Sequence, residues 1–551
     1  MRYRSCEEFN RELEKFILTR LRPSQSFFQI SDIEVFEKDI EMSASERLDF
    51  IDEFWGNYNY MVDKRLSYFN RLTNHIICHE MFRNAIEGRS RVFIQVPTRI
   101  FDKPADIKFQ EESEGENNAV IVSCSLLTLQ ILDYDLMMFR AINSQNVEYS
   151  NSAKHHYRPY LFSFVAELDR QKYDKLLDLF EKAKNREYIL PDSENDSFLW
   201  LECTFGTDII EPHFDIDGYV IQSASRMEKY KAKLKIIENE SVYYTIKKSI
   251  LDYNLPDDHC ICDSEFIDML KSRLDCLSAI DVYKIGNGNC VLAKDTQGDS
   301  LFFFDIGFNY GHRPGIISPG TLYNYSDSMK EILANDPSFL ILSHWDMDHI
   351  AGSYAAKKDI LDKDWFAPCC FDACTNTKRL AKYLYLNGKL HCISRKAPGR
   401  QIGASIIIDK DPFKASYTLY MGAKAACDSS YANCEGIVME YKNLQKNKTI
   451  LMMGDVNYES YNKARLSVSK LSFADSQIDY LVVPHHGSAH TNHRLITDHG
   501  RIIKKGTRAI VCCTNEISNN RPNDEHLREL EKRFTVCTTE EIIDESVRIC
   551  I

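Results

Sequence analysis

The chain has 551 residues, of which 44% are hydrophobic and 27% are charged, and its formal net charge is −13. This length exceeds what one ordinary core supports, so two or more domains are expected. No apolar run reaches the ~20 residues that cross a bilayer, and the charged N-terminus lacks a signal-peptide core. We therefore expect a cytoplasmic protein with no membrane partner, in which most of the 18 cysteines are free, buried thiols.

The negative charge is concentrated in the first half of the chain. Residues 1–275 hold 35 basic and 49 acidic residues, whereas residues 276–551 hold 33 and 32. Such an acidic segment is unsuited to general nucleic-acid binding, because phosphates are held by clustered cations. The first half is instead a candidate for docking a protein partner.

The first half alternates helical and strand-like patterns, which predicts a mixed α+β domain over residues 1–275. The predicted helices are 7–21, 44–74, 168–183 and 227–238, and the predicted strands are 91–96, 119–126, 160–165, 198–205 and 218–223. This part contains no motif that indicates a function, so its role stays open.

A stretch rich in cysteine and acidic residues lies near the expected domain boundary. It reads LPDDHCICDSEF and contains His259, Cys260 and Cys262. A C-x-C pair without a second pair at zinc-finger spacing is weak evidence for metal. An acidic linker above packed cysteines is the favoured interpretation here, and the same holds for CCFDAC at residues 369–374.

From residue 280 the pattern changes to strands that end in polar groups. A strand, a glycine-containing turn and a second strand occupy residues 280–295, and the next strand ends at Asp305. A helix is predicted at 377–387, and strands are predicted at 436–441, 449–453, 480–483 and 509–512. Chemistry gathered at strand ends is typical of layered α/β proteins.

Three of these strands end on groups that bind metals. They are followed by SHWDMDH at residues 343–349, by GD at 454–455 and by PHH at 484–486. One Asp after a strand commonly caps a helix, and one His pair is commonly a surface feature. Three buried strands delivering such groups together indicate a shared metal site, because each group is costly to leave unpaired.

These motifs resemble a known family. HWDMDH is similar to the H-x-[HD]-x-D-H signature of the metallo-β-lactamase fold, and the later GD and VPHHGS resemble the hydrolase domain of ComEC-type DNA-uptake proteins. The resemblance covers about residues 280–551. It implies an αββα sandwich in a hydrolase domain at 276–551, with metal-dependent phosphodiester hydrolysis as its activity.

The resemblance also implies a set of metal ligands. These are His344, Asp346, Asp348, His349, Asp455 and His485. His344 and Asp346 would face one ion, Asp348 and His349 a second, with Asp455 bridging and His485 completing the second set. Asp346 stands where zinc enzymes of this fold carry His, which favours Mn²⁺, with Zn²⁺ or Mg²⁺ as alternatives, at one or two divalent sites. Asp305 is expected to orient a ligating His.

Further groups are assigned to catalysis or substrate binding. Catalytic candidates are Asp348, His486, Ser488 and His490, of which the last three would either protonate the leaving group or only order their loop. Lys504, Lys505 and Arg508 would steer a polyanion, unless this basic run is simply a solvated face. Arg521 replaces the family's His before Pro522 and would bind phosphate without acting as an acid.

The function that these observations favour is a nuclease acting on DNA or RNA through a metal-bound hydroxide, as a regulated effector. One alternative is a hydrolase of a small phosphoester such as a cyclic nucleotide, or of a lactone or thioester. A second alternative is a non-catalytic scaffold. A basic groove at the metals would favour a polymer, and a small closed pocket would favour a small molecule.

Overall fold

The structure is a computed structural model. It describes residues 91–101, 120–157, 159, 163–184, 189–191, 197–205, 214–223, 226–256, 258–286, 288–308, 328, 331–332, 334–355, 360–369, 375–395, 397–423, 434–469, 477–496, 506–513 and 522–551. The helices predicted at 7–21 and 44–74 lie outside these ranges. Within them, no helix combines the length and the apolar character that crossing a bilayer requires.

The first half is built on a closed antiparallel sheet of six strands. The strands run in the order β1 (Val92–Pro97), β2 (Val120–Thr128), β3 (Ser163–Leu168), β6 (Phe214–Ser223), β7 (Arg226–Ile236) and β5 (Ser197–Phe205). The sheet closes because β1 pairs with both β2 and β5, and the short β4 (Ile189–Pro191) extends β5. Closure leaves few unpaired backbone groups on strand edges.

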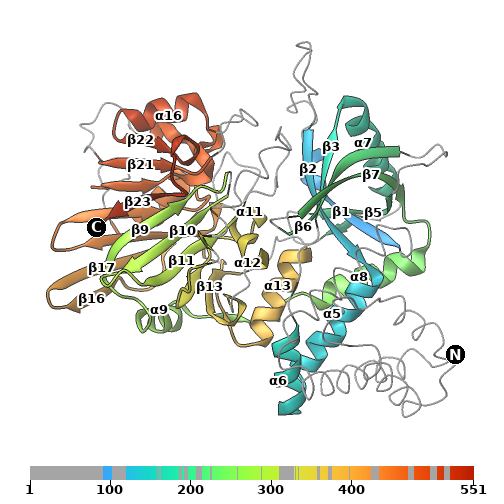
Figure 1. Cartoon of the computed structure of the whole chain (residues 1–551), viewed down its shortest axis with the longest axis horizontal. Coiled ribbons are helices and arrows are strands. Elements are labelled where there is room, and N and C mark those ends of the chain that lie inside the picture. The colour runs from blue at the N-terminus through green and yellow to red at the C-terminus, as the bar shows by residue number, and fades with distance from the viewer. Residues whose placement is uncertain are drawn as a thin grey trace, which may run out of the picture.

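Four helices accompany the closed sheet. They are α5 (Leu129–Ile142), α6 (Val147–His156), α7 (Arg170–Lys184) and α8 (Glu240–Asp252). α5 begins where the Thr128 hydroxyl accepts a hydrogen bond from the backbone N–H of Ile131, and α8 begins with Asn239 capping in the same way. Figure 1 shows this half at the right, with α5 and α8 below the sheet.

The helix predicted at residues 227–238 is wrong, because this segment is β7. Its Lys, Glu, Ala and Leu residues favour a helix in isolation. β7 instead pairs with β6 along one edge and with β5 along the other, and it buries Ala232 and Leu234 in the apolar core. Two strand partners and core burial outweigh the local preference, since helix propensity is worth well under about 1 kcal/mol per residue.

The second half contains two mixed eight-stranded sheets. The first runs β23 (Ser546–Cys550), β9 (Leu277–Tyr283), β10 (Cys290–Asp295), β11 (Ser300–Ile306), β12 (Phe339–Ile341), β13 (Asp364–Pro368), β14 (Leu390–Ile393) and β8 (Cys260–Ile261). The second runs β15 (Arg400–Gln401), β17 (Phe413–Met421), β18 (Ile437–Asn443), β19 (Lys448–Met452), β20 (Tyr480–Val482), β21 (Arg508–Val511) and β22 (Thr535–Thr538), with β16 (Ile406–Lys410) paired to β17.

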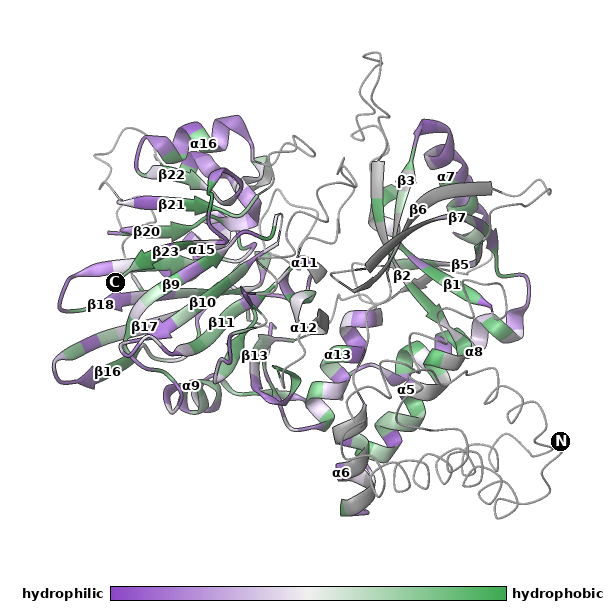
Figure 2. Ribbon diagram, in the orientation of Figure 1, coloured by the Kyte–Doolittle hydropathy of each residue, from purple (hydrophilic) through white to green (hydrophobic). Residues whose placement is uncertain are grey.

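The two sheets face each other across one apolar core. Successive side chains of a strand point to opposite faces, and β19 shows this directly. Ile450 and Met452 belong to the core that also contains Phe302 and Phe339 of the other sheet. Leu451 lies in a separate outer cluster with residues of α15 (Tyr458–Leu466) and α16 (Asp524–Glu531). Figure 2 shows green stretches along the strands of both sheets, with purple toward the ends of strands such as β16 and β21, and α16 largely in purple.

The two halves are joined through α13 (Thr375–Leu386), which lies between them in Figure 1. Arg379 of α13 is buried and forms an ion pair with the buried Asp135 of α5. The hydroxyls of Tyr157 and Tyr253 donate to the same carboxylate, at 2.5 and 3.1 Å. The carboxylate and guanidinium are therefore both satisfied inside the contact between the halves.

The expected boundary between the two domains lies between residues 275 and 276. Residues 260–271, just before it, pack with the second half. β8 pairs with β14, and Phe266, Ile267 and Leu270 of α9 (Asp263–Lys271) lie in the core between the two sheets. The layered part of the structure thus begins near Cys260.

Candidate metal centre

The metal-type side chains gather where parallel strands end. β11 and β12 are parallel neighbours in one sheet, and β19, β20 and β21 are parallel neighbours in the other. His344 follows β12, Asp455 follows β19, and the 3-10 turn η5 (Pro484–Gly487) follows β20. Asp348 and His349 come from the short helix α11 (Met347–Ile350). The carboxyl ends of parallel strands meet at one edge, which is why loops distant in sequence converge here.

Asp455 lies at the centre of this cluster. Its Oδ1 is 3.2 Å from Nε2 of His349 and 3.7 Å from Nε2 of His486. Its Oδ2 is 3.5 Å from Nδ1 of His485 and 4.0 Å from Nε2 of His344. The two oxygens of one buried carboxylate therefore face two different groups of ligands.

The group at Oδ1 is the more compact of the two. Asp348, His349, Asp455 and His486 are all buried, and each offers a ligand atom within 4.8 Å of the others. His486 Nε2 is 3.3 Å from a carboxylate oxygen of Asp348. On the Oδ2 side, Nε2 of His344 lies 3.6 Å from Asp346, whose side chain is about one-fifth exposed at 21%.

The imidazole nitrogens of the cluster indicate a cation. Within the part of the chain that the structure describes, the buried Nε2 atoms of His344, His349 and His486 have no hydrogen-bond partner. Nδ1 of His486 lies 3.0 Å from the carbonyl oxygen of Cys512 and must donate to it, so its Nε2 carries the lone pair. A lone pair facing carboxylates is favourable only when a proton or a metal ion lies between them. This donor set fits a divalent metal.

Asp305 orients the second histidine of the motif. Its Oδ2 lies 2.8 Å from Nδ1 of His349, which turns Nε2 of that ring toward Asp455. The carboxylate also accepts from the backbone N–H of Ser343 at 2.6 Å, from the Ser343 hydroxyl at 2.7 Å and from the Asn289 amide at 2.8 Å. These bonds hold Asp305 in a left-handed conformation with φ of 58°.

Ser343 extends this orientation to His344. Because the Ser343 hydroxyl donates to Asp305, it accepts from Nδ1 of His344, which is 3.0 Å away. The lone pair of His344 is thereby placed on Nε2. The sequence analysis assigns no role to Ser343. Its position directly before His344 is the feature that could have suggested one.

Without a bound metal, the carboxylates and imidazoles of the cluster shift one another's pKa values. Burial acts against a charged imidazole at His349, but the carboxylates of Asp305 and Asp455 outweigh it and raise the pKa of His349 well above its usual value. Burial likewise opposes a charged Asp455, but His485, His349 and His486 outweigh it and hold the pKa of Asp455 well below its usual value. A bound metal would therefore displace a proton.

The loop after β20 places two histidines next to different oxygens of Asp455. His485 and His486 both have positive φ, at 53° and 56°, which is uncommon for residues other than glycine. The sequence predicts that His485 completes the group of Asp348 and His349, and this stays a prediction. The structure places His486 in that group, whereas Nδ1 of His485 lies 3.5 Å from Oδ2 of Asp455.

A buried histidine that the sequence did not single out supports this loop. Nδ1 of His526 lies 3.1 Å from the carbonyl oxygen of Ser488, and its Nε2 lies 3.1 Å from the Tyr458 hydroxyl. Burial lowers the pKa of His526 to about 4, so the ring is neutral near pH 7. Ser488 itself is buried within the loop.

Among the remaining candidates, only Arg508 has a described side chain, and it lies away from the cluster. Arg508 begins β21 and is exposed, whereas Cys512, whose carbonyl contacts His486, follows the other end of that strand. Roughly 13 Å of extended chain separates them. The side chain of His490 and all of Lys504, Lys505 and Arg521 lie outside the described residues.

Comparisons with known proteins leave the family open. No family model matches the chain, and no curated protein matches it. The solved structures to which the chain shows similarity include three enzymes. They are unliganded yeast PDE1, a mutant of the CmlA β-hydroxylase, and CmlA, a diiron β-hydroxylase from Streptomyces venezuelae.

Their identities to this chain are 11, 11 and 10%, with TM-scores of 0.29, 0.30 and 0.23. The matches cover 50, 98 and 72% of this chain and 100, 93 and 80% of theirs. Similarity at this level supports no conclusion about the fold or function of this chain.

Proposed function

We propose that the chain is a metal-dependent hydrolase whose second half, residues 276–551, has the αββα metallo-β-lactamase fold of the ComEC-type branch. The observation that carries this proposal is the position of Asp455 between two ligand groups. A buried carboxylate that faces histidines from each of its oxygens is suited to bridging two cations. Two facing sheets with helices on their outer sides accord with the proposed fold.

The proposed reaction is hydrolysis of a phosphodiester. Divalent ions held at the cluster would supply an activated water and would offset charge on the phosphate oxygens. Asp348, His349, Asp455 and His486 would hold one ion, and His344, Asp346 and His485 the other. Asp305 and Ser343 fix the tautomers of His349 and His344.

DNA or RNA is the proposed substrate class, and the first half is proposed to be a regulatory or partner-docking domain of a cytoplasmic effector. The resemblance of the motifs at residues 343–349, 454–455 and 484–486 to ComEC-type domains is what favours a polyanion, and Arg508 at the far end of β21 adds nothing to it. The acidity of residues 1–275 suits a protein partner better than nucleic acid.

The test is cleavage of single- and double-stranded DNA and of RNA by the full chain with Mn²⁺, Zn²⁺ or Mg²⁺. Asp348→Asn removes a charge from the compact group and is expected to reduce cleavage by at least about 100-fold. Asp409→Asn is the matched control, since Asp409 is exposed and pairs only with Lys414 among the contacts described for it.

Metal-dependent cleavage that is lost in Asp348→Asn and kept in Asp409→Asn would support the proposal. Hydrolysis of cyclic nucleotides or of bis-p-nitrophenyl phosphate without polymer cleavage would change the substrate to a small phosphoester. No hydrolysis of any of these, with metal bound at the cluster, would reject phosphodiesterase activity in favour of a scaffold.

A further inference from the structure

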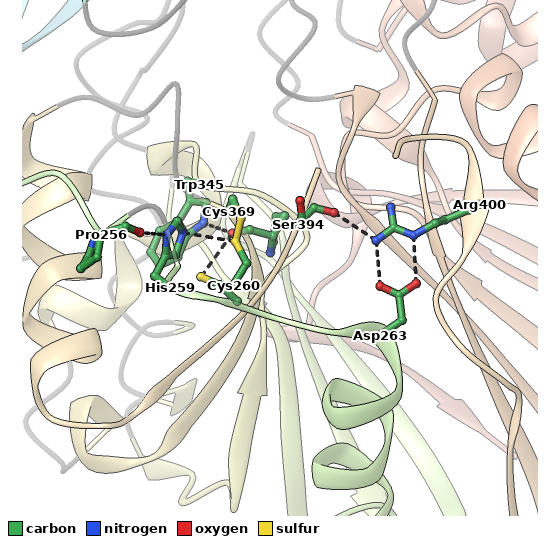
Figure 3. The surroundings of a disulfide bond; sticks show 10 residues. Pro256, His259, Cys260, Asp263, Trp345, Cys369, Ser394 and Arg400 are labelled. Atoms are coloured by element: carbon green, nitrogen blue, oxygen red, sulfur yellow. Dashed lines mark hydrogen bonds and ion pairs between the residues drawn. A yellow bond between two sulfur atoms is a disulfide. The ribbon is translucent and has the colours of Figure 1, made fainter. Parts of the chain in front are cut away.

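A second cluster of metal-type ligands lies apart from the Asp455 centre. It consists of His259, Cys260 and Cys369, whose ligand atoms lie within 4.8 Å of one another. Cys260 begins β8 and Cys369 directly follows β13, so two segments separated by 109 residues meet here. Figure 3 shows the histidine ring beside the two sulfur atoms.

His259 presents a lone pair to the sulfurs. The residue is 92% buried, with a relative exposure of 8%. Its Nδ1 lies 2.5 Å from the carbonyl oxygen of Pro256 and must donate to it, so the lone pair is on Nε2. That nitrogen lies 3.5 Å from Sγ of Cys260. The ring is thus held in the tautomer and direction of a metal ligand.

The neighbouring polar residues are engaged elsewhere. Asp263 binds Arg400 through both carboxylate oxygens at 2.9 Å, as Figure 3 also shows. Cys262 is exposed, and its Sγ lies 3.2 Å from the Ser264 hydroxyl. The cluster therefore has one imidazole and two sulfurs as its donors among the described residues.

In the structure Cys260 and Cys369 form a disulfide, the only one within the described part of the chain. A thiol reductant such as glutathione would convert it to two thiols while two reductant thiols become a disulfide. Two thiols and an imidazole lone pair would then share one largely buried space. Binding of Zn²⁺ would release the two thiol protons and satisfy all three donors.

We propose that, with Cys260 and Cys369 reduced, His259 and the two thiolates bind one Zn²⁺ ion. These three donors fill three positions of a tetrahedral site. Sulfur ligands distinguish this site from the Asp455 centre, which contains only nitrogen and oxygen donors, because thiolates select Zn²⁺ over Mn²⁺ or Mg²⁺.

The site has a structural consequence for the first metal-type loop. The carbonyl oxygen of Pro368, next to Cys369, accepts a 2.6 Å hydrogen bond from the indole N–H of Trp345. Trp345 lies between His344 and Asp346 in the chain. An ion that binds Cys260 and Cys369 would therefore also fix the position of Pro368, whose carbonyl oxygen anchors Trp345 in the first metal-type loop.

The test uses Co²⁺ as a spectroscopic substitute for Zn²⁺ in the reduced full chain. Cobalt bound to thiolate gives a strong sulfur-to-metal charge-transfer absorption, which nitrogen and oxygen ligands do not give. We expect one equivalent of this absorption, displaced by Zn²⁺. Cys260→Ser and Cys369→Ser should abolish it, and His259→Ala should weaken Zn²⁺ binding by about 100-fold or more.

Two control variants should keep the absorption at full strength. Cys262→Ser removes a cysteine of the same segment that lies outside the cluster, and Asp348→Asn alters the other centre. The wild-type chain offers an independent readout, because Zn²⁺ should protect Cys260 and Cys369 from alkylation and a chelator should remove the protection.

Absence of the absorption in the reduced chain, together with equal alkylation of both cysteines with and without Zn²⁺, would overturn the proposal and leave a redox-active disulfide. Absorption that persists in both Cys260→Ser and Cys369→Ser would overturn it as well, because other cysteines would be the ligands. Neither result bears on hydrolysis at the Asp455 centre.

Discussion

Asp305 and His349 form the contact that sets the chemistry of the candidate metal centre, with Oδ2 of the carboxylate 2.8 Å from Nδ1 of the ring. The carboxylate fixes which nitrogen of His349 faces Asp455. Through the Ser343 hydroxyl it also fixes the same choice at His344. One residue that is not itself among the ligand candidates therefore decides the direction of two lone pairs.

Asp305→Asn should weaken metal binding by about 10- to 100-fold without unfolding the chain. Asparagine tolerates the left-handed backbone of this position, so the change acts through the lost charge. Calorimetric titration of the metal-free chain with Mn²⁺ measures the effect. Asp295→Asn, at the last residue of β10, is the control and should leave the affinity unchanged.

Gly454→Ala should destabilise the chain by about 2 kcal/mol or more, because overpacking adds to backbone strain. A Cβ at Gly454 would lie 2.3 Å from Oγ and 2.4 Å from Cβ of Ser343. Gly388 is a matched control, since its φ of 64° resembles the 54° of Gly454 and a Cβ there would meet nothing within 4 Å. Urea unfolding of both variants isolates the contact, and equal losses would show that only the backbone conformation matters.

The chain should lose about 2 kcal/mol of stability between pH 7 and pH 5 through His526. Burial lowers the folded-state pKa of His526 to about 4, below the ~6.5 of an unfolded histidine. The unfolded chain therefore takes up a proton in this window and the folded chain does not, so stability is present above pH 6.5 and falls as the pH approaches 4.

Urea unfolding at a series of pH values measures this loss. His526→Gln, which keeps a side chain able to bond Tyr458 but does not titrate, should lower stability at pH 7 and flatten the dependence. An unchanged pH dependence in this variant would assign the effect to other groups.

Arg379→Met should destabilise the chain by about 3–5 kcal/mol, because it leaves the buried carboxylate of Asp135 without its cation. The double variant with Asp135→Asn should recover part of this loss. Thermal or urea unfolding followed by two probes, one in each half, measures it. Arg170→Ala is the control, since its ion pair with Asp174 is exposed and is expected to contribute less than about 1 kcal/mol. Equal effects at the two sites would contradict a buried coupling between the halves.

The short segments that carry the candidate chemistry are recognisable in the amino-acid sequence alone. A buried strand followed at once by metal-type ligands is a local pattern, and HWDMDH, Asp455 and the His485–His486 pair are all visible in it. Strands such as β1, β5 and β11 are also predictable, because their apolar runs and bounding turns are short-range features. The role of Asp305 beside a ligating histidine follows from the same motif.

How these segments meet depends on the three-dimensional fold and is not visible in the sequence. His485 and His486 are adjacent in sequence and both have positive φ, yet their rings lie next to different oxygens of Asp455. β7 becomes a strand because two neighbours pair with it. Arg508 lies at the far end of its strand, and Cys369 meets His259 and Cys260 across the sheet edge. Each outcome depends on strand order and side-chain direction, which arise from contacts between residues far apart in the chain.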